Sequence, residues 1–213
     1  MIKGIKLPET ISSRTEYKRK FSFWEMYRSF VTLPGAVAKM IRNKKNKLVD
    51  KGLIERLQLA VPEVNGCAAC SYAHTYIALK QGMSNEEINS FLIGDGNFLK
   101  QEEAKAIVFA QHFADTRGFP KKEAYESIIN EYGEEKARVI LAASQLMIAG
   151  NIYGIPYSAL QSRLKRKPYK DSSLLYELGM HIGGFFLLPV ALIHGILRGI
   201  MGFSDIRLDK STL

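Results

Sequence analysis

The chain has 213 residues, of which 46% are hydrophobic and 24% charged, and it carries a net charge of +9 at pH 7. This composition is typical of a folded globular protein and excludes a disordered or collagen-like chain. Because there are only two cysteines, a secreted scaffold held together by disulfides is excluded as well.

The positive charge is concentrated at the two ends of the chain. Residues 1–51 contain 13 Lys and Arg against 4 Asp and Glu, residues 52–160 contain 9 against 13, and residues 161–213 contain 8 against 4. Basic segments of this kind contact anionic lipid or nucleic acid, or form an ordinary solvated surface. No nucleic-acid motif and no interleaved aromatic residues accompany the basic run at 44–47, so no nucleic-acid partner is expected.

The N-terminal residues do not have the pattern of a secretory signal. Residues 1–20 are polar, and the first apolar stretch contains Glu25 and Arg28. We therefore expect a cytoplasmic protein with reduced thiols.

Apolar residues recur every three or four positions along most of the chain, which predicts an all-α fold. Ser84-Asn85-Glu86-Glu87 has the pattern of a capping box, in which Glu87 is expected to reach back to the Ser84 amide. The predicted helices cover residues 22–41 with an interruption at Leu33-Pro34-Gly35, 52–61 with a break over Pro62–Gly66, 67–81, a segment that opens at Ser84, 100–115, a segment between Gly118 and Gly133, and 134–149.

The C-terminal tail contains 20 consecutive residues, 178–197, without Asp, Glu, Lys or Arg. This length is sufficient to cross a bilayer core of about 30 Å. His181 and His194 argue against a span, because histidines inside lipid need polar partners. The Gly183-Gly184 pair and Pro189 indicate two shorter helices. We expect a buried or oligomer-interface hairpin, with membrane-surface contact through residues 178–203 and a membrane span as alternatives.

The two cysteines form a single Cys-x-x-Cys motif, Cys67-Ala68-Ala69-Cys70. A cysteine at the start of a helix has a stabilised thiolate, which favours a redox pair. A zinc site would need two further ligands, and the chain has no second cysteine pair and only four histidines. The third interpretation is a pair of small buried residues without chemistry.

His74 and Glu55 are the other two candidate site residues. On a helix, positions 67, 70 and 74 share one face, so His74 can take or relay a thiol proton. Glu55 lies twelve residues before Cys67, in a predicted helix, and beside Arg56 it reads by itself as a solvated charge. If the turn over residues 62–66 brings the two helices together, Glu55 would face His74 and orient its imidazole.

These four residues carry a resemblance to a known family. The pattern Glu55, Cys67-x-x-Cys70 and His74, followed by Gly82-Met83-Ser84, resembles the alkylhydroperoxidase D-like branch of the carboxymuconolactone decarboxylase family. The resemblance extends more loosely to about Ser162. It implies an all-α orthogonal helical bundle of the alkylhydroperoxidase D-like type, which forms homo-oligomers and needs no cofactor or metal. The extra apolar helical tail lies outside it.

The resemblance also implies an activity, the reduction of hydroperoxides by a dithiol–disulfide cycle. Cys70 would be the peroxidatic thiol, Cys67 the resolving thiol, and His74 with Glu55 the proton relay. A lipoylated or thioredoxin-like protein would be the dithiol reductant. From the residues alone, the helix start favours a low pKa for Cys67, whereas the position of His74 favours Cys70. Ala69 stands where the best-known members of this branch carry a second histidine.

The alternative function is a non-enzymatic oligomeric or membrane-surface protein that uses the cysteine pair as a redox sensor. For the domain organisation, the sequence predicts a basic N-terminal arm over residues 1–20, an alkylhydroperoxidase D-like helical domain over 21–165 and an apolar C-terminal helical appendage over 171–213.

Overall fold

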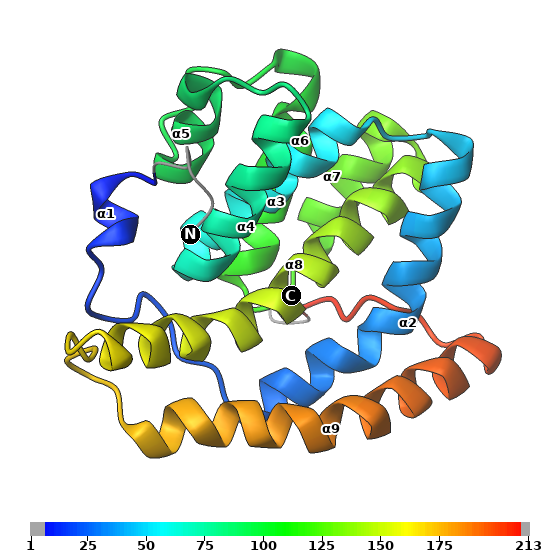
Figure 1. Cartoon of the computed structure of the whole chain (residues 1–213). Helices are drawn as coiled ribbons and strands as arrows, with labels where there is room; N and C mark the ends of the chain where they lie inside the picture. The colour runs from blue at the N-terminus through cyan, green and yellow to red at the C-terminus, as the bar shows by residue number, and fades with distance from the viewer. Residues whose placement is uncertain (1–6, 210–213) are drawn as a thin grey trace.

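The computed structural model describes residues 7–209, and over these residues the fold is all-α (Figure 1). The first six residues of the expected N-terminal arm and residues 210–213 of the expected appendage lie outside the described range. The elements are α1 (Glu9–Ser12), α2 (Phe23–Asn46), α3 (Lys51–Asn65), α4 (Ala68–Lys80), α5 (Asn85–Ile93), the 3-10 turn η1 (Gln101–Glu103), α6 (Ala104–Asp115), α7 (Lys122–Tyr132), α8 (Glu134–Leu164) and α9 (Leu174–Ile200).

The long helix α8 is the centre of the molecule. It contacts α2, α3, α4, α6, α7 and α9, and most of its side chains between positions 137 and 159 are buried. Helices α3, α4, α6 and α7 pack on α8, and α5 packs on α3 and α4. Helices α2 and α9 lie along another side of α8, with α9 at the bottom of Figure 1. The hydrophobic core is thus formed around α8, an apolar helix that is buried by its neighbours over most of its length.

Side-chain caps set the beginnings of several helices. Ser22 and Glu25 form a full capping box at α2, and Asp50 caps α3 by accepting from the amide of Leu53. At α5, the Ser84 hydroxyl accepts from the Glu87 amide as expected. The Glu87 carboxylate does not return to Ser84, because it is paired with Arg56 instead. The Ser84 side-chain cap is therefore confirmed, whereas the expected hydrogen bond from the Ser84 amide to the Glu87 carboxylate is wrong.

Two predicted helix breaks and one predicted helix end are absent. α2 runs through Pro34, α3 continues past Pro62 to Asn65, and α8 extends fifteen residues beyond the predicted end at 149. Proline removes one intrahelical hydrogen bond, but packing of the surrounding turns outweighs that loss. The helix α3 ends instead at Gly66, whose left-handed backbone (φ 78°) suits glycine.

The predicted hairpin in the tail is also wrong, because residues 174–200 form one continuous helix. Gly184 and Gly195 face the body of the molecule rather than a turn. A Cβ atom on Gly195 would lie 2.2 Å from the backbone oxygen of Val31, and one on Gly184 would lie 2.8 Å from the ring of Tyr153. These glycines therefore let α9 approach α2 and α8 closely, and they do not break the helix.

The first turns of α9 are held by a buried ion pair. The Glu177 carboxylate accepts hydrogen bonds from Arg163 Nε at 2.8 Å, from Arg163 Nη2 at 2.9 Å and from the Ser172 hydroxyl at 2.7 Å. Burial by itself would raise the pKa of Glu177, but these hydrogen bonds and the charge of Arg163 outweigh it and lower the pKa. The start of α9 is thus fixed to the end of α8.

Candidate active site

The cysteine pair lies at the N-terminus of α4. Cys67 is the N-cap residue, and its sulfur accepts a hydrogen bond from the Cys70 amide at 3.2 Å. Cys67 and Cys70 are joined by a disulfide, so this structure represents the oxidised form of the pair. Cys67 is fully buried and Cys70 is 8% exposed, which makes Cys70 the more accessible sulfur. A thiolate formed here would be stabilised by the free amides at the helix start.

α8 forms a close wall against the two sulfur atoms. A Cβ atom on Gly154 would lie 2.7 Å from Cys67 Sγ and 2.8 Å from Cys70 Sγ, so only glycine leaves room for both. One turn further along α8, the Ser158 hydroxyl accepts from the Ala69 amide at 3.0 Å and donates to the Gly154 carbonyl at 2.8 Å. Ser158 therefore satisfies one of the free amides at the start of α4.

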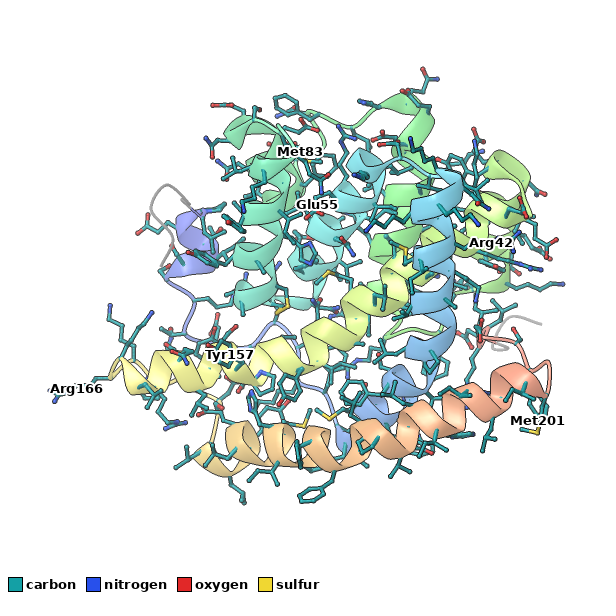
Figure 2. The ribbon with its side chains drawn as sticks, turned by 45° about the vertical axis from the view of Figure 1, so that its right-hand side comes forward. Arg42, Glu55, Met83, Tyr157, Arg166 and Met201 are labelled. Carbon is teal, nitrogen blue, oxygen red and sulfur yellow. A yellow bond between two sulfur atoms is a disulfide. The ribbon has the colours of Figure 1, made fainter. Side chains whose placement is uncertain are left out.

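His74 and Glu55 are brought together by the packing of α3 against α4. His74 Nδ1 lies 2.8 Å from Glu55 Oε1, and the Glu55 side chain is 3% exposed. Figure 2 shows Glu55 on α3, inside the molecule. The solvated interpretation of Glu55 is wrong, because its side chain is buried and is paired with His74. The carboxylate fixes the imidazole orientation and leaves Nε2 for another partner.

His74 lies four residues after Cys70 on α4, so the two side chains share one helix face. The sulfur pair, the imidazole and the carboxylate therefore form a row from the start of α4 to α3. Such a row has the parts of a thiol with a proton relay: a sulfur nucleophile, a group that moves a proton and a carboxylate that orients it.

α3 itself is fixed on its other side by Arg56. This buried guanidinium pairs with Glu87 at 2.7 Å and with Glu103 at 3.2 Å. Burial raises the pKa of Glu103, and Arg56 opposes that rise. Because Arg56 is occupied by these two carboxylates, the adjacent Glu55 remains paired with His74.

Three residues that shape this site were not predicted from the sequence: Gly154, Ser158 and Asn151. Asn151 accepts from the Asn65 side-chain amide at 3.0 Å, a buried contact that joins the end of α3 to α8. All three lie on α8, far along the chain from the cysteines, and none belongs to a motif. Their only sequence signal is the presence of small and polar residues in an otherwise apolar helix.

The described residues, 7–209, contain no group of three or more His, Cys, Asp or Glu side chains arranged to hold a metal ion.

Comparison with known proteins agrees with the fold and the motif. The family model named Carboxymuconolactone decarboxylase family matches residues 25–108, a segment that holds Glu55, both cysteines and His74. No curated protein and no solved structure matches the chain. Over this segment the chain is similar to the carboxymuconolactone decarboxylase family, an all-helical family, and the resemblance seen in the sequence is confirmed there. α7, α8 and α9 lie beyond the matched residues.

Proposed function

We propose that the protein is a thiol-dependent peroxidase that reduces hydroperoxides through a cycle of Cys67 and Cys70. The observation that carries this proposal is the cysteine pair at the start of α4 with the 2.8 Å Glu55–His74 contact one turn beyond it. The match of residues 25–108 to the model of the carboxymuconolactone decarboxylase family is compatible with an enzyme of this kind.

In the first step, the Cys70 thiolate attacks one peroxide oxygen. The O–O bond breaks, Cys70 becomes a sulfenic acid, and the leaving alkoxide takes a proton from His74 to give the alcohol. Cys70 is assigned this role because it is the more exposed sulfur and lies one turn from His74. Glu55 holds the imidazole and stabilises its protonated form.

In the second step, Cys67 attacks the sulfenic sulfur of Cys70. The S–S bond forms, and the sulfenic oxygen leaves as water after it takes a proton. The amide of Cys70 donates to Cys67 Sγ, which favours the Cys67 thiolate needed for this attack. A dithiol reductant, a lipoylated or thioredoxin-like protein, then takes up the oxidising equivalent and restores both thiols.

Two further expectations belong to this proposal. The cycle needs a compartment that maintains reduced dithiols, for which we propose the cytoplasm. We also propose that the chain forms homo-oligomers, as its family resemblance implies.

Turnover measurements on cysteine variants test the proposal. Cys70→Ser should abolish peroxide consumption supported by a dithiol reductant, because the attacking sulfur is lost. Cys67→Ser should consume one equivalent of peroxide and then stop, with a sulfenic acid trapped on Cys70 by dimedone. Circular dichroism confirms that each variant retains its helices. If steady-state consumption survives in both variants, the mechanism is wrong.

One observation favours a second candidate function, a membrane-surface protein that uses the cysteine pair as a redox sensor. The outward face of α9 is apolar along its whole length and exposed, with Leu175, Phe185 and Ile200 each more than 70% accessible. A chain that binds vesicles and consumes no peroxide would be this second protein and not the first.

A further inference from the structure

We infer that a small cavity remote from the cysteine pair is a binding site for a phosphate group. The cavity has a volume of about 60 Å³ and lies where α2, α8, α9, the turn after α6 and the C-terminal segment meet. By the volume that a single water needs, it has room for about five waters or one group of phosphate size. Nothing in the proposed peroxidase cycle uses it.

Four arginines line this cavity, and among the described residues only Arg117 has a carboxylate partner. Glu25 is bound by Ser22 and Arg117, and Asp205 is bound by Lys39. Within residues 7–209, Arg28, Arg198 and Arg207 therefore remain without an acidic side chain in hydrogen-bond contact, although Arg198 donates to the Ser204 carbonyl. The site has an excess of positive charge that an anion would neutralise.

Arg28 is the residue that points most directly to a ligand. Its guanidinium lies over the Phe119 ring, 4.5 Å from the ring centre, and its Nε atom is buried with no hydrogen-bond partner in the described part of the chain. Burial lowers the pKa of Arg28, and the charge of Arg207 lowers it further, while Glu25 opposes both. A buried donor without an acceptor is costly, and an oxyanion would remove that cost.

Gln145, which also lines the cavity, provides a free acceptor. Gln145 donates from Nε2 to the Asp205 carbonyl at 2.8 Å, and its Oε1 atom is buried without a partner. A carboxylate could satisfy the arginines but has no hydrogen to give to Gln145. A singly protonated phosphate group offers acceptor oxygens for Arg28 and Arg207 and one P–OH donor for Gln145.

The parts that close this cavity lie beyond the segment matched by the family model. Gln145 is on α8, Arg198 on α9 and Arg207 on the C-terminal segment, whereas the match ends at residue 108. The cavity thus combines Arg28, which lies inside the matched segment, with residues of the C-terminal half that lie outside it. The phosphate group could come from a free ion, a small ester or a lipid headgroup. These sources differ in whether the phosphate carries no substituent, a small polar one or an acylated glycerol.

Calorimetric titration of the full chain tests the inference. The probes are inorganic phosphate, inorganic sulfate, glycerol 3-phosphate and dihexanoyl phosphatidic acid below its micelle concentration, all at matched ionic strength. We expect one saturable phosphate site per chain. Sulfate should bind at least tenfold more weakly, because it has the same shape but no O–H donor at neutral pH. The ester that binds more tightly identifies the source.

Variants decide whether binding occurs in this cavity. Arg28→Gln and Arg207→Gln should each weaken phosphate binding about tenfold or more, which corresponds to about 1.4 kcal/mol. Arg207 is exposed, so its variant does not disturb the core. Arg42→Gln, an exposed arginine outside the cavity, is the matched control and should bind as the wild type does. The inference is overturned if no probe saturates, if sulfate binds as tightly as phosphate, or if the two variants bind unchanged.

Discussion

Gly154 controls the space around the sulfur atoms more than any residue of the motif itself. Its missing side chain lets α8 approach both cysteines, and the Ser158 hydroxyl one turn later holds the backbone of α4 against it. The geometry of the disulfide is therefore shared between α4, which carries the sulfurs, and α8, which limits their movement.

Gly154→Ala should slow the peroxide-driven loss of thiols by about tenfold, because the added methyl group would force the sulfurs out of place. Stopped-flow thiol measurements on reduced protein would show this. Gly150→Ala is the matched control on the same helix, since its new methyl group would meet only Met147, at 3.9 Å. Equal rates for the two variants would show that the contact with α8 has no part in the chemistry.

At this scale the sequence predicted part of the site well. Cys67, Cys70 and His74 share a helix face by their spacing alone, whereas the Glu55–His74 contact depended on a turn over residues 62–66 that folds α4 back onto α3. Ser158 meets the motif from 89 positions beyond Ala69, through a contact created only by the packing of α8 on α4. No local pattern encodes a contact of that kind.

Among the elements, α9 shows how packing overrides local signals. Glycine and proline within a helical pattern indicate breaks when neighbours are unknown. In α9, Gly183, Gly184 and Gly195 lie on the face that touches α2, and Pro34 of α2 lies against Gly195. The close approach supplies contacts along both helices, which stabilise the helical state despite poor intrinsic propensity. The sequence therefore predicted the helical class of the tail but not its continuity.

Gly195→Ala should lower the free energy of unfolding by about 3 kcal/mol, because its methyl group would collide with the Val31 backbone oxygen. Gly199→Ala, one turn further on the exposed side of α9, meets nothing within 4 Å and should raise that free energy by about 0.5–1 kcal/mol. Urea unfolding followed by circular dichroism measures both. A neutral Gly195→Ala would mean that α9 does not pack closely on α2.

At the scale of the whole molecule, the most prominent feature is the exposed apolar surface on the outward face of α9. Two described helices, α8 and α9, are long and apolar enough to cross a membrane by length and composition. α8 is a buried core helix, but most of the apolar stretch of α9 is exposed, and its side chains point away from the body (Figure 2). The two histidines of α9 have partners, His194 with the Tyr27 hydroxyl and His181 with the Glu177 carbonyl.

This face is suited to lie on an anionic bilayer. Its apolar residues would enter the surface layer, while the exposed basic run at residues 165–167 could contact headgroups. We expect the wild type to float with vesicles of phosphatidylcholine and phosphatidylglycerol, and the double variant Phe185→Glu, Ile193→Glu to remain unbound. Val108→Glu, which changes an exposed apolar residue on α6, is the control and should float.

The opposite result would assign the face differently. If the wild type does not float and the double variant has a smaller mass in light scattering, the outward face of α9 is an interface between copies of the chain. Membrane binding would then be excluded as the role of this surface.

Counting free thiols in the reduced protein before and after one equivalent of cumene hydroperoxide tests the central claim most directly. We expect rapid loss of both thiols, and mass spectrometry should locate one disulfide between Cys67 and Cys70. Two thiols that remain free and unreactive would contradict it, since the cysteines would then be a buried pair without redox chemistry.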